Sequence, residues 1–144
     1  MRFIADLHIH SKYARAVSPK MTLPELDRWA DDKGIQVMGT GDFTHPLYFA
    51  DLERQLEPAE QGLYRLKKKY KLPTIKGTFA DTRFLLATEV SSIYTRGGRG
   101  RRVHTLLFAP DLETVKKIND VITARGGNLK SDGRPIIGLD IQEI

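Results

Sequence analysis

Apolar positions recur along the chain with two periods, and the change from one period to the other predicts where strands and helices lie. Alternation every second residue, or a short apolar run, is typical of strands, whereas recurrence every ~3.6 residues is typical of helices. Strands are therefore predicted at 2–9, 35–38, 84–90 with an extension to Tyr94, and 103–109. Helices are predicted at 22–33, 47–56, from Pro58 to Tyr70, and 111–125.

The first three of these elements follow one another as strand, helix and strand. This order predicts a βαβ unit, in which two parallel strands are joined by a right-handed crossover. Thr22 and Glu25 are spaced as a capping box at the start of the helix, and Pro24 is tolerated in its first turn. We therefore expect an α/β fold with mostly parallel strands and flanking helices. Its active site is expected at the C-terminal ends of the strands, where His10 and Asp42 fall.

Composition and charge narrow the class of protein. With 144 residues, 40% of them hydrophobic and 28% charged, the chain is expected to form one globular domain with a modest core. No apolar run approaches the ~20 residues of a membrane span, and no signal-like leader is visible. The chain has no cysteine, which excludes disulfides and thiolate metal sites and fits the cytoplasmic location that we expect. The net charge of +5 favours an anionic partner.

A small polar cluster interrupts the first predicted strand. Asp6, His8 and His10 lie two positions apart, so on a strand they would share one face. Two imidazoles on one side of a short strand can bind a single metal ion or bridge two, and the nearby carboxylate can ligate or can orient an imidazole. The alternative is that both histidines are hydrogen-bonded surface residues at a strand end.

Glu89 and an arginine-rich loop add to this chemistry. Glu89 interrupts an apolar strand, and a buried carboxylate needs a metal ion, a cation or water, because burying it unpaired is costly. The segment 95–102 combines glycines with concentrated positive charge, which suits contact with a phosphate backbone. The alternative interpretation of this segment is a solvated hairpin tip. Its arginines are Arg96, Arg99, Arg101 and Arg102.

Four separated motifs, in order along the chain, resemble those of the PHP (polymerase and histidinol phosphatase) superfamily, and most of all its endonuclease Q branch. The motifs are Asp-Leu-His-Ile-His at 6–10, Gly-Thr-Gly-Asp at 39–42, Ala-Thr-Glu-Val at 87–90 and Val-His-Thr-Leu-Leu-Phe-Ala-Pro at 103–110. The resemblance implies a distorted (βα)7 barrel with up to three Zn, Mn or Fe ions at its C-terminal mouth, and Mg is a further candidate.

The same motifs imply roles for single residues. The positions that match metal ligands are His8, His10, Glu89 and His104. Asp42 stands where many members have the histidine of a Thr-Asp-His motif, and aspartate is a competent ligand for hard cations. We assign the catalytic roles to Asp42 and Glu89. His45 matches no ligand position, and Asp6 matches a supporting residue.

Some motifs that the resemblance implies are absent. PHP sites are completed by later histidines and an Asp-x-His element, which the sequence up to Ile144 does not contain. Residues 1–144 are therefore expected to form a partial PHP metallo-phosphoesterase domain, the N-terminal portion of the barrel. Because about half a barrel cannot close on itself, we expect a homodimer or a larger assembly to cover the exposed sheet edge.

The leading functional hypothesis is a metal-dependent phosphodiesterase that nicks DNA beside a deaminated or damaged base. This chain alone is expected to be weakly active or inactive, because such catalysis depends strongly on complete positioning of the ions. Two alternatives stay open. One is a small phosphomonoesterase resembling histidinol phosphatase, and the other is a non-catalytic module for nucleic-acid binding or assembly.

Overall fold

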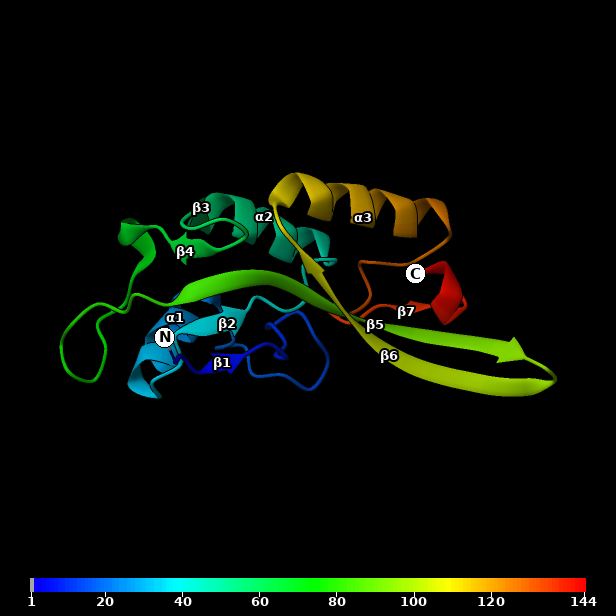
Figure 1. Cartoon of the computed structure of the whole chain (residues 1–144), viewed down its shortest axis with the longest axis horizontal. Coiled ribbons are helices and arrows are strands. Elements are labelled where there is room, and N and C mark those ends of the chain that lie inside the picture. The colour runs from blue at the N-terminus through cyan, green and yellow to red at the C-terminus, as the bar shows by residue number, and fades with distance from the viewer. Residues whose placement is uncertain (1) are drawn as a thin grey trace.

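The computed structural model describes residues 2–144, which form a mixed sheet and three α-helices (Figure 1). The strands are β1 (Ala5–Asp6), β2 (Val37–Gly39), β3 (Leu56–Pro58), β4 (Tyr64–Leu66), β5 (Arg83–Arg96), β6 (Arg99–Ala109) and β7 (Ile136–Ile137). The helices are α1 (Leu23–Asp32), α2 (Pro46–Gln55) and α3 (Leu112–Ala124), with short 3-10 helices at Lys68–Tyr70 and Ile141–Glu143.

Strand β5 is the centre of the sheet. Its first residues pair in parallel with β2 and in antiparallel orientation with β4. From Leu86 to Arg96 it pairs with β6 in a long hairpin, and Ser91 and Ser92 also pair in parallel with β7. In Figure 1 the outer part of the β5–β6 hairpin extends away from the helices. One long strand therefore connects the body of the fold to a projecting hairpin.

The predicted βαβ unit is confirmed, since β1 and β2 are parallel and α1 connects them. The apolar positions of helical period in α1 are buried, namely Leu23, Leu26 and Ala30. The predicted capping box does not form. Thr22 makes no side-chain cap hydrogen bond, and Glu25 instead pairs with Arg28 at 2.7 Å. The helix is therefore held mainly by its buried face.

The sheet is mixed rather than mostly parallel. The parallel pairs are β1–β2, β2–β5 and β5–β7, whereas β3–β4, β4–β5 and β5–β6 are antiparallel.

The helix predicted from Pro58 is instead the hairpin β3–β4. Tyr64 and Leu66 are buried on either side of exposed Arg65, which pairs with Glu57 across the hairpin at 2.8 Å. In this segment every second side chain is buried, as in a strand, although the apolar residues are also spaced as in a helix. Closure of the sheet into a (βα)7 barrel stays a prediction.

The first strand is shorter than predicted. Only two residues form β1, and the preceding Phe3 and Ile4 are 62% and 59% exposed. A strand buries a face only where another element covers it, and within residues 2–144 β1 has β2 as its one neighbour in the sheet. His8 and His10 therefore lie in the loop after β1, beyond the strand on which a shared face was predicted.

The core lies between β5 and the helices. Its largest cluster includes fully buried side chains of β5, α2 and α3, namely Phe84, Leu86, Tyr48, Leu52 and Val115.

Asp111 begins α3 as predicted, because its side chain accepts a hydrogen bond from Thr114 N at 2.7 Å. Val121 is an apolar residue of the predicted helix at 111–125, but its side chain is exposed. Among the helices of residues 2–144, none has the length and apolar character needed to cross a membrane.

Candidate metal centre

Side chains from three segments meet at one buried carboxylate, that of Glu89 on β5. From the loop after β1, His8 Nε2 and His10 Nε2 approach Glu89 Oε2 at 2.8 and 3.0 Å. From β6, His104 Nδ1 approaches Glu89 Oε1 at 2.5 Å. The hairpin register sets His104 opposite Ser91, two residues after Glu89, so both side chains fall on one face of the hairpin. We call these three histidines and Glu89 the Glu89 cluster.

The donor set of the Glu89 cluster fits a divalent metal ion. One ligand atom each from His8, His10 and Glu89 lies within 4.8 Å of the others. Neutral imidazole nitrogen together with carboxylate oxygen suits Zn, Mn or Fe. The side chains of His8 and His104 are 52% and 43% exposed, so an ion can reach the cluster from solvent. His8, His10 and Glu89 could therefore hold a metal ion.

Burial and nearby charges have opposite effects on the pKa values of Glu89 and His10. Burial raises the pKa of Glu89, but the hydrogen bond from His8 and the charges of Arg134 and the neighbouring imidazoles outweigh it, so that pKa is lowered overall. The hydrogen bond to Asp42 raises the pKa of His10, against the opposing effect of burial. Glu89 is therefore held as an anion, and protons on the imidazoles compete with a metal ion for the same nitrogens.

Asp42 lies behind His10, outside the Glu89 cluster. Its Oδ1 is 2.9 Å from His10 Nδ1, and its Oδ2 accepts hydrogen bonds from Ser11 N at 2.5 Å and from Ser11 Oγ at 2.7 Å. The side chain is fully buried with both oxygens engaged. A carboxylate on the far nitrogen of an imidazole fixes the tautomer and directs the other nitrogen towards a metal. Asp42 does not belong to the group of residues that could hold a metal ion in the described part of the chain, and its role as a direct ligand stays a prediction.

The backbone after β2 explains how Asp42 comes so close to the loop after β1. Gly41 has φ of +66°, and a Cβ at this position would collide with Ile9 O. Asp42 itself has φ of +49°, a conformation that aspartate adopts more readily than most residues. The Gly-Asp pair at 41–42 therefore lets the two loops pack in direct contact.

Two residues near the cluster escaped prediction from the sequence. Arg134 Nη1 lies 3.9 Å from Glu89 Oε2, the oxygen that two imidazoles also approach. Its one signal was a cation within the turn Ser-Asp-Gly-Arg-Pro at 131–135. Ser11, which holds Asp42, carries no local signal, because its partner lies 31 residues further along the chain.

Two other residues considered from the sequence lie outside the cluster. Asp6 supports the loop after β1, since its Oδ1 accepts a hydrogen bond from His8 N at 3.3 Å. His45 is buried at the start of α2 and stacks on Tyr13, with the ring centroids 4.6 Å apart. The roles predicted for Asp6 and His45 stay predictions.

The predicted arginine-rich loop is the tip of the β5–β6 hairpin. All four of its arginines are exposed, namely Arg96, Arg99, Arg101 and Arg102. Arg96 also lies 3.5 Å from a carboxylate oxygen of Asp140. The structure does not bring these arginines into the Glu89 cluster, because they lie further out along the hairpin (Figure 1). Strand β6 nevertheless carries both His104 and the exposed arginines, so it links the tip to the cluster.

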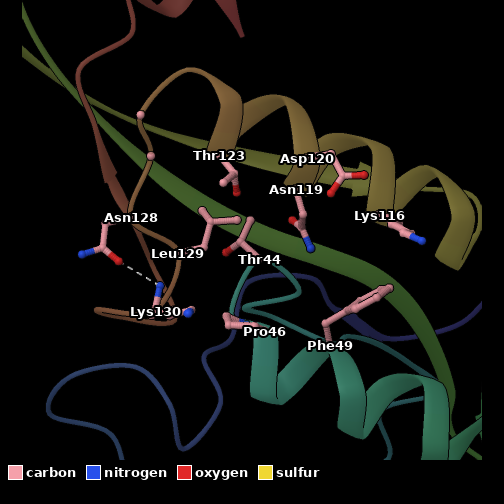
Figure 2. Close-up of a pocket in the computed structure, with 12 residues that line it drawn as sticks. Thr44, Pro46, Phe49, Lys116, Asn119, Asp120, Thr123, Asn128, Leu129 and Lys130 are labelled. Atoms are coloured by element: carbon pink, nitrogen blue, oxygen red, sulfur yellow. Dashed lines mark hydrogen bonds between the residues drawn. The ribbon is translucent and has the colours of Figure 1, made fainter.

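A pocket of about 630 Å³ lies between α2, α3 and the loop that follows α3 (Figure 2). Phe49 of α2, Asn119 of α3 and Lys130 of the loop contribute to its walls. Thr44 also lines the pocket and donates a hydrogen bond to Gly133 O at 3.3 Å. The pocket is therefore separate from the Glu89 cluster but shares with it the turn that contains Gly133.

Comparison with known proteins agrees with the motifs, although no protein-family profile matches the chain. A segment of 49 residues, 34% of the chain, is 37% identical to an uncharacterized protein from Methanocaldococcus jannaschii, of which it spans 6%. The crystal structure of the lesion-specific endonuclease PfuEndoQ from Pyrococcus furiosus aligns with 98% of the chain at 30% identity and a TM-score of 0.77. Endonuclease Q in complex with a 27-mer duplex substrate that has an abasic lesion at the active site aligns with 98% of the chain at 31% identity, also with a TM-score of 0.77.

The chain is thus similar in structure to endonuclease Q, a PHP-superfamily enzyme, and the resemblance inferred from the four motifs is confirmed. It spans 30% and 31% of the lengths of the two solved chains. The similarity therefore covers nearly all of this chain and a minor part of each neighbour.

Proposed function

We propose that this chain contributes the metal centre of a DNA endonuclease. The observation that carries the proposal is the convergence of three imidazoles on Glu89, in a fold similar to that of a lesion-specific endonuclease. Hydrolysis of a phosphodiester needs stabilisation of developing negative charge and a strong nucleophile at neutral pH. The chemistry that a divalent metal ion supplies at such a site is polarisation of a phosphoryl oxygen and acidification of water.

The residues of the chain have distinct roles in this proposal. His8, His10 and Glu89 would hold the metal ion, and His104 is a further candidate ligand beside the other oxygen of Glu89. Asp42 keeps the Nδ1 proton of His10 engaged, so that the Nε2 lone pair faces the cluster. The assignment of Asp42 as a catalytic residue is replaced in this proposal by that positioning role.

The substrate that we propose is DNA with a deaminated or damaged base. The net charge of +5 and the exposed arginines of the hairpin tip support an anionic polymer as partner. The complex of endonuclease Q with a lesion-containing duplex supports the same substrate class. Since the chain spans about a third of that enzyme, we expect weak or no activity from residues 1–144 alone. A cytoplasmic location remains a prediction.

The proposal is tested first by metal binding. Titration of the metal-free chain with Zn²⁺ or Mn²⁺ should show binding that is lost in the double variant His8→Ala/His10→Ala. The matched control is His45→Phe, which removes a histidine outside the cluster and keeps a ring against Tyr13. Unchanged metal binding in the double variant would falsify the metal centre.

Activity separates the proposed function from its alternatives. The metal-loaded chain should bind DNA, and its phosphodiester cleavage, which we expect to be weak, should be sensitive to EDTA. Hydrolysis of p-nitrophenyl phosphate without DNA binding would instead indicate a phosphomonoesterase. DNA binding that is independent of metal, with no hydrolysis under any metal condition, would indicate a non-catalytic binding module.

A further inference from the structure

Resting on the proposed function, we propose that Arg134 is a phosphate-binding residue that holds the non-bridging oxygens of the substrate phosphodiester beside the metal centre. The proposal combines three observations: the turn that carries Arg134 is held firmly in place, its guanidinium is close to Glu89, and the donors of that guanidinium are not used by other groups of the chain. Each is argued in turn.

The turn at 131–135 is held from several sides. Gly133 N donates a hydrogen bond to Tyr13 O at 3.0 Å, and Ser91 N of β5 donates to Pro135 O at 2.9 Å. Arg134 N donates to Asp132 Oδ1 at 3.1 Å. These contacts connect the turn to the loop after β1 and to β5, two of the three segments that carry the Glu89 cluster. The backbone of Arg134 is therefore fixed relative to the cluster.

Gly133 shows how closely the turn approaches the site. A Cβ at this position would collide with the carboxylate of Asp42 and lie 3.0 Å from Ala14 N. Thr44 Oγ1 donates to Gly133 O at 3.3 Å on the other side. A side chain at position 133 would thus push the turn outward, and its absence lets the next residue reach the cluster.

The guanidinium of Arg134 lies beside the Glu89 cluster but forms no hydrogen bond with Glu89. Its Nη1 is 3.9 Å from Glu89 Oε2, beyond hydrogen-bond distance, and the side chain is 39% exposed. Within residues 2–144 we find no hydrogen bond donated by this guanidinium. Arg83, by contrast, has its guanidinium engaged by Glu60 and Asp81. Arg134 therefore keeps its planar set of N–H donors for a ligand.

The charge and shape of the site select a phosphate as that ligand. A guanidinium offers parallel N–H groups that match two oxygens of a phosphate, whereas a carboxylate alone repels this anion. Arg134 is a cation beside the same Glu89 oxygen that His8 and His10 approach. A phosphodiester that contacts Arg134 therefore lies next to the proposed metal ligands, where hydrolysis requires it. A residue that only neutralised Glu89 would be expected to form a direct hydrogen bond with it.

The test measures the binding of inorganic phosphate and of metal separately. In the Mn²⁺-loaded chain, phosphate affinity is followed by ³¹P relaxation, and Mn²⁺ affinity is measured by calorimetry. Arg134→Ala should weaken phosphate binding by about 10-fold or more, and Arg134→Lys, which keeps the charge but loses the planar fork, should give an intermediate loss. Mn²⁺ affinity should stay the same or rise, because a neighbouring cation is removed. Lys116→Ala, which removes a positive charge at the pocket on α3, is the matched control and should change neither affinity.

Three outcomes would decide against the inference or against its premise. Phosphate affinity within about two-fold of the unsubstituted chain in Arg134→Ala overturns the phosphate-binding role. A parallel loss of Mn²⁺ affinity and of thermal stability in both variants would show that Arg134 only maintains the structure of the site, which also overturns it. If the unsubstituted chain binds no metal, the proposed function fails. Phosphate binding is then compared on the metal-free chain, where a loss in Arg134→Ala supports the role of Arg134 and no loss overturns it.

Discussion

His10 Nδ1 and Asp42 Oδ1 lie 2.9 Å apart, so the carboxylate engages the imidazole nitrogen that faces away from Glu89. With its proton on Nδ1, His10 presents an Nε2 lone pair to the Glu89 cluster, which is what a metal ion requires. Ser11 holds the other oxygen of Asp42 through its backbone N–H and its hydroxyl. The pair therefore joins the loop after β1 to the loop after β2 beside the Glu89 cluster.

Asp42→Asn is expected to weaken Zn²⁺ binding by about 10- to 100-fold. Because Ser11 donates two hydrogen bonds, the amide oxygen of the variant would face Ser11 and its NH₂ would donate to His10 Nδ1. His10 would then carry its proton on Nε2, where the metal needs a lone pair. Asparagine tolerates the φ of +49° at this position, so the backbone is kept. Competition with a chelating indicator measures the affinity, and exposed Asp120→Asn is the control. Equal affinities would mean that the carboxylate does not orient His10.

Replacing Arg99, Arg101 and Arg102 with alanine should weaken DNA binding for all sequences alike. Each phosphate contact releases nearly one counterion, so the slope of log K against log salt should decrease in magnitude by up to about 3. Fluorescence anisotropy with a DNA duplex over a range of salt concentrations measures that slope. The control variant replaces exposed Lys68, Lys69 and Lys76 with alanine and removes the same charge elsewhere. An unchanged slope in the arginine variant would assign the hairpin tip to a solvated turn.

Gly41→Ala should destabilise the fold more than Gly62→Ala. Both glycines have positive φ, of +66° and +75°, so the two variants share the backbone strain. A Cβ at position 41 would collide with Ile9 O, whereas one at position 62 meets nothing within 4 Å. We expect Gly41→Ala to lower the free energy of unfolding by about 1–3 kcal/mol more than Gly62→Ala. Denaturant unfolding measures this difference, and equal losses would show that the loop after β1 moves away without cost.

Asp27 should make the stability of the chain depend on pH in a direction opposite to that of most carboxylates. It is buried on α1, and burial raises its pKa although Lys71 Nζ lies 3.5 Å away. The folded chain therefore binds this proton more tightly than the unfolded chain does. The contribution of Asp27 to the free energy of unfolding is highest below its unfolded pKa and falls as pH rises towards its folded pKa.

Asp27→Asn removes this titration, which gives the measurement. Unfolding free energies of the unsubstituted chain and the variant are compared between about pH 4 and about pH 7. With rising pH, the unsubstituted chain should lose stability relative to the variant. If the Asp27→Asn curve runs parallel to that of the unsubstituted chain, the Asp27 carboxyl titrates normally in the folded protein.

Self-association is expected from the apolar residues beside β1. Phe3 and Ile4 are exposed next to a strand that pairs with β2 alone among residues 2–144, and such edges favour pairing with another chain. Light scattering at micromolar concentration should therefore detect a homodimer or a larger assembly. The double variant Phe3→Lys/Ile4→Lys should shift it towards monomer, whereas Ile75→Lys at another exposed position should not. A stable monomer of the unsubstituted chain would contradict the prediction.

The amino-acid sequence by itself determined the elements whose local pattern is strong. The spacing of Leu23, Leu26 and Ala30 was sufficient for α1, and Asp111 marked the start of α3. The apolar run around Leu86 was sufficient for most of β5. Signals of this kind lie within a few neighbouring residues, so they survive in any tertiary context. The motifs likewise indicated the candidate ligands, because residue type and order are properties of the sequence.

Only the tertiary structure decided how these parts are used. It turned the segment after Pro58 into a hairpin and placed Asp42 behind His10, 32 residues away in the chain. It also brought Arg134 to Glu89, although the two are far apart in the sequence. Roles of this kind depend on which groups meet across the fold and on how much water they exclude. Local periodicity carries no information about such contacts, because they arise only when distant segments pack against one another.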